Sequence, residues 1–338
     1  MKNISELALM TFKGIKSKTV EKIFPEIIIK AENLKKENKN CYYVGIKNTN
    51  VISIEFIKKL EKLGLLHHTL DYMSKGGRAI DINFQNPITG RLMTGSSSAT
   101  AINVFLGIND IGIGTDGGGS VLAPALSVNL YGFVSNLFDK NNMIRFKKES
   151  TDGITFSPSI GILSKNIDNL EYVISNILIE RDLESKNDIG VKIANPIIQE
   201  QNNFYEQIKE DLEKYSLGNV SLSYKTLDRK FMIEELKGFD FDNNILITFE
   251  GPIDFYEYGD SIMGHYSEYT KRKQALAHKY YLKVINMLNL SAFAIPSSDL
   301  SLGALIICKS ELDKIRFSLE IAKSIKFKRS ELEENYFN

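Results

Sequence analysis

Gly95-Ser-Ser-Ser-Ala-Thr100 and Ile111-Gly-Ile-Gly-Thr-Asp-Gly-Gly-Gly-Ser120 belong to the part of the sequence that is richest in serine and glycine. The apolar segment between them, Ala101 to Ile113, predicts a helix followed by a strand. Each serine cluster would then lie in a turn beside one of these elements. Glycine permits sharp turns and leaves backbone N–H groups uncovered, and a site that stabilises developing negative charge requires such groups. We therefore interpret this stretch as a candidate catalytic centre.

Strand and helix patterns alternate along the chain around this centre. Short apolar runs predict strands at 41–47, 190–194, 220–224, 245–249 and 303–308. Helical spacing predicts helices at 53–63, 168–180, 204–218 and 267–290, and another from Ser310 with a capping box through Asp313. Ser53 is expected to cap its helix, with Ile54, Ile57, Leu60 and Leu63 on one face and Gly64 as the stop. The alternation indicates an α/β fold with a mixed sheet.

The composition is that of an ordinary globular protein. The 338 residues are 43% hydrophobic, which permits one large domain over 1–338. We expect a helical lead-in at 1–40, the catalytic motifs at 41–170, and the rest of the sheet with a substrate-covering region at 171–330. The 42 basic and 42 acidic residues balance, so the charge gives no reason to expect a nucleic-acid or membrane partner.

The two cysteines, Cys41 and Cys308, are far apart and provide neither a disulfide framework nor a zinc cluster. The first 20 residues lack the continuous apolar region of an export signal, and no run reaches the ~20 apolar residues of a membrane span. We therefore expect a cytoplasmic protein.

Several weaker motifs have a simpler explanation. His67 and His68 are adjacent and point in different directions, so a core or surface role is favoured over a metal site. Lys75-Gly-Gly-Arg78 has the composition of a solvated turn, although such a segment could bind an anion. Aromatic residues gather at Phe255, Tyr256, Tyr258, Tyr266 and Tyr269, where ordinary packing is favoured over a pocket lining.

Three hypotheses compete for the serine- and glycine-rich centre. Gly112 to Gly117 formally matches a dinucleotide-binding loop, but the chain around Asp139 does not end a second buried strand, so we expect no cofactor. A purely structural role for the glycines and serines is the second hypothesis. The third is nucleophilic attack by Ser120, whose hydroxyl needs a base. Since no histidine lies near these motifs in the sequence, a lysine is the candidate base.

Three motifs in this order resemble the amidase signature family. Val44-Gly-Ile-Lys47-Asn48 is similar to the family's strand ending in Ile-Lys-Asp, and Gly95 to Thr100 resembles its Gly-Ser-Ser-Gly-Gly-Ser turn. Asp116-Gly-Gly-Gly-Ser-Val-Leu-Ala-Pro-Ala125 resembles its Asp-Thr-Gly-Gly-Ser-Ile-Arg-x-Pro-Ala motif, and the spacing of the two key serines is also similar. The resemblance implies the amidase signature fold, a central mixed sheet covered by helices on both faces, in an unusually short member.

The resemblance also implies roles for individual residues. Ser120 would be the nucleophile, Ser96 the bridging serine after a cis peptide bond, and Lys47 the base. Because a base must be neutral, the pKa of Lys47 would have to fall from about 10.4 through burial. The oxyanion hole would consist of the backbone N–H groups of Gly117, Gly118, Gly119 and Ser120. We also expect substrate contacts from Thr94, Ser97 and Asp116, and neither a cofactor nor a metal ion.

Four departures from the family pattern affect five residues. Asn48 replaces an acid, Ser98-Ala99 replaces a Gly-Gly pair, Gly117 replaces a threonine-like residue, and Leu122 replaces an arginine. Our leading hypothesis is a hydrolase that cleaves a small amide through an acyl-enzyme. Acyl transfer to another nucleophile and a non-catalytic amidase-like binding protein are the alternatives, and a homodimer is compatible with the sequence.

Overall fold

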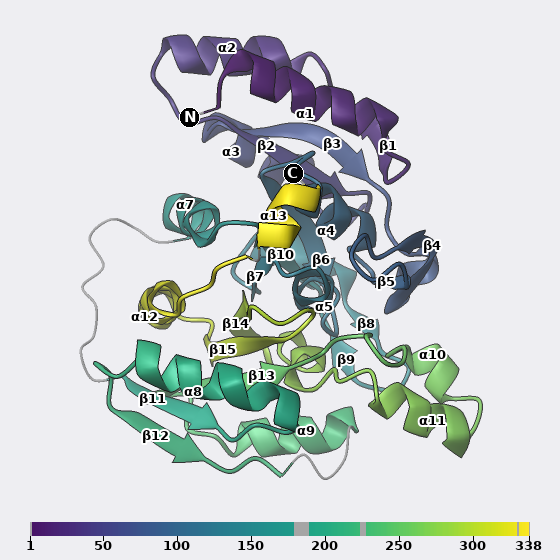
Figure 1. Cartoon of the computed structure of the whole chain (residues 1–338), viewed down its shortest axis with the longest axis vertical. Helices are drawn as coiled ribbons and strands as arrows, with labels where there is room; N and C mark the ends of the chain where they lie inside the picture. The colour runs from purple at the N-terminus through teal and green to yellow at the C-terminus, as the bar shows by residue number, and fades with distance from the viewer. Residues whose placement is uncertain (1, 179–188, 224–227, 330, 338) are drawn as a thin grey trace.

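An eleven-stranded sheet organises the molecule (Figure 1). The computed structural model describes residues 2–178, 189–223, 228–329 and 331–337. In spatial order, the strands of the sheet are β1 (Val20–Ile23), β3 (Leu65–Asp71), β2 (Tyr42–Lys47), β6 (Ile111–Asp116), β10 (Ser159–Ser164), β7 (Tyr131–Ser135), β14 (Leu290–Pro296), β15 (Gly303–Lys309), β13 (Asn244–Glu250), β11 (Gly190–Ala194) and β12 (Leu217–Val220). Strand β2 is parallel to β3 and β6, whereas β10 is antiparallel to β6 and β7. The predicted mixed sheet is confirmed.

Two hairpins and a series of helices surround this sheet. The hairpins pair β4 (Ile80–Gln85) with β5 (Leu92–Thr94), and β8 (Lys148–Glu149) with β9 (Thr155–Phe156). The α-helices are α1 (Ile4–Lys16), α2 (Ile27–Lys36), α3 (Ile54–Lys62), α4 (Ser98–Phe105), α5 (Leu122–Ser127), α6 (Lys140–Met143), α7 (Ile167–Ile177), α8 (Asn202–Asp211), α9 (Arg229–Lys237), α10 (Ser261–Gly264), α11 (Glu268–Ala275), α12 (Leu312–Ser324) and α13 (Glu331–Phe337). The 3-10 turns are η1 (Lys75–Gly77), η2 (Ile144–Phe146), η3 (Gln199–Gln201), η4 (Tyr281–Lys283) and η5 (Asn286–Leu288).

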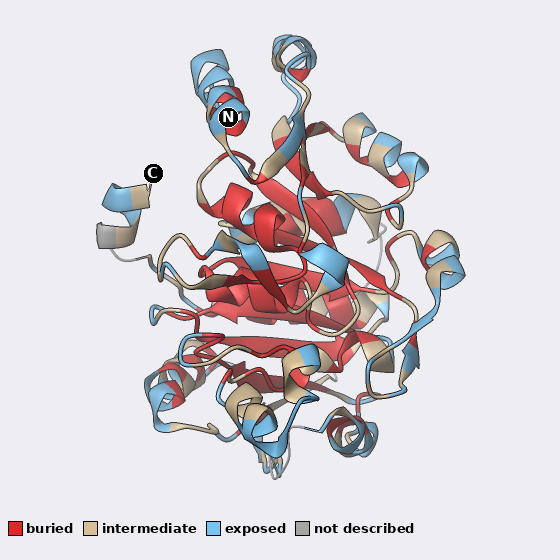
Figure 2. Ribbon diagram, turned by 90° about the vertical axis from the view of Figure 1, so that its right-hand side faces the viewer, coloured by how far each residue is buried: buried red, intermediate tan, exposed pale blue. Residues whose placement is uncertain are grey.

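Helices cover both faces of the sheet, as the amidase signature fold implies. One apolar cluster joins one face to α3, α7, α8 and α12. A second cluster joins the opposite face to α4, α5 and α9. Figure 2 shows that the buried residues form a continuous layer through the middle of the molecule, with exposed helices on either side. Strands between two apolar layers must be hydrophobic on both faces, which is why their sequences are nearly continuous apolar runs.

Helix α3 shows how closely local signals set the element boundaries. Ser53 caps it by accepting the Phe56 N–H at 3.0 Å, as predicted. The chain turns at Gly64, which has a φ of +77° and where a Cβ would lie 2.1 Å from the carbonyl oxygen of Asn40. The predicted apolar face was partly wrong, because Phe56 and Leu60 are buried whereas Ile54 is 65% exposed.

Three other expectations differ from the structure. The segment 1–40 contains the edge strand β1 between its two helices. Helix α12 begins after Glu311 without a side-chain cap, since the Ser310 hydroxyl is bonded to Ser291 and to the Asn289 carbonyl. The strand predicted at 220–224 is displaced to β12, and Tyr224 lies outside the described residues.

The helix expected over 267–290 is also wrong. Helix α11 ends at Ala275, and the rest of the expected helix, up to residue 290, holds only the two short 3-10 turns η4 and η5. The N–H groups of Tyr280 and Leu282 donate to the buried carboxylate of Glu250, at 2.6 and 2.9 Å. A side chain from a distant strand therefore satisfies N–H groups that a helix would satisfy with its own carbonyls.

Candidate active site

Lys47 is the last residue of β2 and is only 2% exposed. Its Nζ donates to Ser96 Oγ at 2.7 Å and to the Thr115 carbonyl at 3.3 Å. Burial lowers the pKa of Lys47 from 10.5 to about 7, while the Asp116 carboxylate acts to raise it and Lys148 to lower it. A substantial fraction of this amine is therefore neutral near pH 7, and a neutral amine can accept a proton.

Backbone hydrogen bonds fix the turn that carries Ser96. The Gly95–Ser96 peptide bond is cis, as the resemblance implies. The Gly95 N–H donates to the Ala79 carbonyl at 2.9 Å, and the Ser74 N–H donates to the Ser96 carbonyl at 3.2 Å. The chain is crowded here, because a Cβ on Gly95 would lie 2.4 Å from the Arg78 carbonyl oxygen.

The Ser96 turn and the Ser120 loop lie against each other. The Ser97 N–H donates to the Ser120 carbonyl at 3.1 Å. Strands β2 and β6 are parallel neighbours, so Lys47 and Asp116 leave the sheet at the same edge. The structure therefore brings Lys47, Ser96 and Ser120 together at the carboxyl ends of two adjacent strands, where open α/β sheets commonly place their sites.

Asp116 shapes the glycine loop that follows β6. Its Oδ1 accepts the Gly119 N–H at 2.9 Å and its Oδ2 accepts the Val121 N–H at 2.6 Å. The side chain is 1% exposed, and burial raises its pKa. Asp116 is thus turned inward under the loop, where its carboxylate holds the Gly119 and Val121 N–H groups.

The same bonds alter the expected oxyanion hole. The Gly119 N–H points at Asp116, so it is not available to a ligand. Within the described part of the chain, no acceptor is recorded for the N–H groups of Gly117, Gly118 and Ser120. Three of the four expected donors therefore remain open.

Thr94 and Ser97 also lie beneath the surface of the site. Thr94 is 1% exposed and donates to Asp254 at 2.6 Å. Ser97 is fully buried, and its hydroxyl has no recorded partner and packs against Gly114, where a Cβ would lie 2.5 Å from it. Both side chains are buried beside the serine turn, and their expected substrate contacts stay a prediction.

Two further departures from the family pattern have structural explanations. Leu122 is fully buried in the apolar cluster beneath α5, close to Gly132 of β7. The position that carries an arginine in the family pattern therefore faces the core. The Asn48 side chain donates to Glu21 of β1 at 2.5 Å, away from the triad candidates.

A cleft of about 820 Å³ opens beside both serine turns. It is lined by Ala79, which is hydrogen-bonded to Gly95, and by Gly118 of the glycine loop. Its other walls come from 151–152, from the start of α9, and from α10, α11 and η4. This volume is typical of small-molecule sites.

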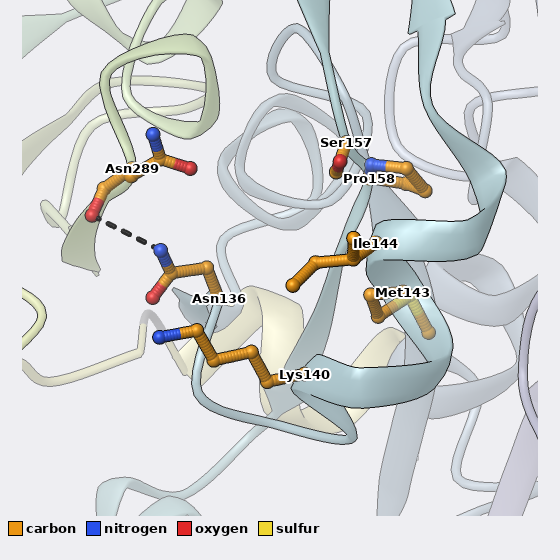
Figure 3. Close-up of a pocket in the computed structure, with 7 residues that line it drawn as sticks. All are labelled: Asn136, Lys140, Met143, Ile144, Ser157, Pro158 and Asn289. Carbon is orange, nitrogen blue, oxygen red and sulfur yellow. Dashed lines mark hydrogen bonds between the residues drawn. The ribbon is translucent and has the colours of Figure 1, made fainter.

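A second pocket of about 360 Å³ lies near the same sheet edge (Figure 3). It is lined by Asn136, Lys140, Met143, Ile144, Ser157, Pro158 and Asn289. None of the predicted site residues lines it. The cleft beside Gly118 is therefore the better candidate for a substrate site.

The weaker motifs have structural roles. His68 is buried, bonds Asn109 through Nδ1 at 2.8 Å and stacks near Tyr43. Arg78 is paired with Asp260. The Gly112–Gly117 motif lies mostly within strand β6 and does not form the loop that a dinucleotide would need. The Asp139 carboxylate accepts from the Ser53 hydroxyl at 2.6 Å, at the start of α3. Neither feature supports the dinucleotide hypothesis.

The aromatic residues at 255–269 do not line either pocket described above. Phe255, Tyr256, Tyr266 and Tyr269 are 36%, 46%, 82% and 63% exposed. The favoured expectation of ordinary packing is wrong for Tyr266 and Tyr269, whereas Phe255 packs against Tyr256 and Tyr256 also contacts His278.

No group of three or more histidine, cysteine or acidic side chains among the described residues is placed to hold a metal ion. No helix in the same part of the chain is long and apolar enough to cross a membrane.

Sequence analysis missed the elements that cover the glycine loop. Leu282 lies over Gly119, where a Cβ would be 2.2 Å from its Cδ1. Glu250 holds this segment in place through the N–H groups of Tyr280 and Leu282, and burial raises its pKa to about 8. One signal was present in the sequence: Glu250 is the charged end of an apolar strand, as Lys47 is.

The sheet, its helical layers and the serine turns define the fold of the amidase signature proteins. Residues 83–230 match the family model described as Amidase. The resemblance to the amidase signature family is thus confirmed over this stretch, which contains the serine turn and the glycine loop. No curated protein sequence matches the chain significantly.

Solved structures share the fold at low sequence identity. An amidase is 13% identical, with a TM-score of 0.61 over 95% of this chain and 94% of that one. An allophanate hydrolase variant from Kluyveromyces lactis is 14% identical, with a TM-score of 0.63 over 96% and 70%. An amidase family protein from Bacillus anthracis str. Ames is 14% identical, with a TM-score of 0.59 over 96% and 88%.

Proposed function

We propose that the protein is an amidase that hydrolyses a small linear amide through an acyl-enzyme on Ser120. The observation that carries this proposal is the 2.7 Å hydrogen bond between Lys47 Nζ and Ser96 Oγ, in a setting that lowers the pKa of Lys47 to about 7. A base is most effective when its pKa is close to the working pH. A buried lysine with an ordinary pKa would remain protonated and could not act as a base.

The proton would move along one line of groups. Neutral Lys47 accepts the Ser96 proton while Ser96 accepts the Ser120 proton, because a serine hydroxyl can donate and accept at once. Ser120 Oγ then forms a bond to the amide carbonyl carbon, and the carbonyl oxygen becomes an oxyanion. The open N–H groups of Gly117, Gly118 and Ser120 are the donors suited to hold it.

Collapse of this intermediate would break the carbon–nitrogen bond. The proton held by Lys47 returns through Ser96 to the leaving nitrogen, which departs as ammonia or an amine. Water then attacks the Ser120 ester, again with Lys47 as the base, and releases the carboxylic acid. The amide and one water are consumed, and one acid and one amine are produced.

Labelling with a fluorophosphonate probe tests the nucleophile. We expect one adduct per chain on the wild type and none on Ser120→Ala. Ser97→Ala is a matched control in the adjacent turn, and we expect it to retain the label. Absence of a Ser120-dependent adduct would favour the non-catalytic alternative. If Ser120 is labelled but product analysis with amide substrates and added amines finds new amides and no free acid, acyl transfer would be favoured.

A further inference from the structure

The cleft beside the serine turns has an excess of positive charge. Its walls include five basic side chains: Arg229, Lys271, Arg272, Lys279 and Lys283. The acidic side chains that line it are fewer: Asp152, Asp228 and Glu268. Lys279 is largely neutralised by Asp254, at 2.7 Å, a residue outside the lining. With Asp254 counted, five basic side chains face four acidic ones, so the cleft keeps a small net positive charge, which favours an anionic ligand.

Arg229 lies against the glycine loop. It begins α9, and its Nη1 lies 3.4 Å from the position of a Cβ built on Gly118. Gly118 contributes one of the open N–H groups of the glycine loop. The charge of Arg229 therefore lies directly beside the proposed oxyanion hole.

The contacts of Arg229 leave part of its guanidinium available. Nε donates to Asp152 at 2.6 Å and Nη2 donates to Thr151 at 3.1 Å. For Nη1, no acceptor is recorded among the described residues. The Arg229 side chain is 16% exposed, so its guanidinium is partly removed from water. Its contacts with Thr151 and Asp152 hold it in place and leave the Nη1 end towards the cleft. The N–H groups of Nη1 carry part of the positive charge of the guanidinium, so this end suits a carboxylate better than it suits a neutral group.

The mouth of the cleft carries charge of the same sign. Lys271 and Arg272 are exposed on α11, and Arg272 forms no ion pair with any of the described residues. Glu268 lies 3.8 Å from Lys271 and offsets only part of this charge. An anion would thus be attracted at the mouth and held at Arg229.

We propose that the substrates are amides that carry a second, anionic group, and that Arg229 binds this group as a carboxylate. Monoamides of dicarboxylic acids are the simplest members of the class. The inference rests on the proposed function, because it assigns the reacting amide to the adjacent Ser120. Arg229 is then a specificity-determining residue, and the cleft orients the amide by its charged end.

Binding tests this inference independently of turnover. Isothermal titration calorimetry of Ser120→Ala would measure the affinity for monoamides from malonamate to glutaramate. Each would be compared with an uncharged amide of equal length, for example succinamate with pentanamide. We expect at least one anionic amide to bind roughly tenfold or more tightly than its neutral match. Adding Arg229→Gln should remove that difference, whereas Arg229→Lys should retain part of it.

Steady-state kinetics provide the second measurement. For the preferred anionic amide, we expect Arg229→Gln to raise KM by roughly 10- to 100-fold while changing the kinetics of the neutral amide little. Lys237→Gln is the matched control, because it removes an exposed charge that pairs with Glu234 on the same helix. That variant should behave as the wild type with both substrates.

The outcomes separate the two proposals. Equal affinity for charged and neutral amides across the series would overturn the anionic substrate, as would binding that is unchanged by Arg229→Gln. Loss of Ser120-dependent labelling would instead overturn the proposed function. The binding measurements on Ser120→Ala would then still show whether the cleft prefers anionic ligands. Thermal unfolding of each variant would show whether a lost preference reflects a lost fold.

Discussion

Phe156 occupies the space that a side chain on Gly117 would need. A Cβ built on Gly117 would lie 2.5 Å from Cε2 and 2.9 Å from Cζ of Phe156. Phe156 is only 9% exposed, and the Lys148 ammonium lies 5.5 Å from the centre of its ring. The ring is therefore confined, and the departure of Gly117 from the family pattern is matched by an aromatic residue from β9.

This pairing predicts a strongly non-additive pair of substitutions. Gly117→Thr should lower kcat/KM by roughly 10- to 100-fold, because the new side chain must displace either the glycine loop or the ring. Phe156→Ala should relieve the clash, so the double variant should be more active than Gly117→Thr alone. The measurement is kcat/KM for the four proteins of the cycle. Losses that simply multiply would show that the two positions are not coupled.

The role of Asp116 gives a second prediction. In Asp116→Asn, one acceptor of the Gly119 and Val121 N–H groups becomes an N–H donor, so the loop loses a buried hydrogen bond and gains a repulsive contact. We expect kcat/KM to fall roughly 100- to 1000-fold. Asp116 also raises the pKa of Lys47, so the acid limb of the remaining activity should move to lower pH.

Asp81→Asn is a suitable comparison for that variant. Asp81 is a buried carboxylate that accepts from the Ser98 hydroxyl and the Asn83 N–H, at 2.5 and 2.9 Å. It should affect thermal stability without moving the acid limb. If Asp116→Asn lowered only the thermal stability and left the pH profile in place, its electrostatic link to Lys47 would be wrong.

Sequence reasoning succeeded where a residue's role follows from the element that carries it. Lys47 ends a buried strand and Ser96 lies in a turn before a helix, and local patterns predicted both elements. The resemblance to the amidase signature family, and not periodicity, implied that the two residues act together. The predicted mixed sheet followed from the same alternation. These features depend on short-range patterns that are visible in any window of ten residues.

Contacts between distant segments explain most of what was missed. Arg229 is more than one hundred residues from Gly118, and nothing in its own sequence neighbourhood indicates that the two meet. The apolar spacing of 267–290 suits a helix, but Glu250 takes two of its N–H groups, and that competition is visible only in three dimensions. The bonds from Asp116 to the glycine loop were also missed, because the sequence does not show which way a carboxylate turns.

Lys148 provides a third prediction, about pH. This exposed cation helps to lower the pKa of Lys47. Lys148→Gln should therefore raise the pKa of Lys47 and reduce the neutral fraction of the base below about pH 7. We expect the acid limb of kcat/KM to move to higher pH, with a roughly two- to fivefold loss at pH 6.5 and little change at pH 9.

Lys147→Gln is the control for the Lys148 variant, because the neighbouring lysine is exposed and does not perturb Lys47. Its profile should overlay that of the wild type. High salt should reduce the difference between wild type and Lys148→Gln, since exposed charges are screened. Identical profiles for both variants at low salt would argue against an electrostatic effect of Lys148 on the base.

The last prediction separates the function of Lys47 from its cost to stability. The pKa of Lys47 is about 7 in the folded protein and 10.5 as its ordinary value, so the unfolded chain binds more protons between these two pH values. The free energy of unfolding should consequently rise with pH across that window, and the penalty for burying Lys47 is largest at neutral pH and below. Lys47→Met removes the ionisable group but also the hydrogen bonds to Ser96 and Thr115.

We expect Lys47→Met to lose roughly a thousandfold or more in kcat/KM and to be about 1–3 kcal/mol more stable than the wild type at pH 7. Urea unfolding from pH 6 to pH 10 would measure the difference, which should shrink as the pH rises because the wild type no longer has to lose a proton to fold. Ser96→Ala is the control, since it removes the hydroxyl partner and leaves the lysine in place. It should be equally inactive but without the gain in stability, so a gain shared by both variants would show that the burial of an ionisable amine is not its source.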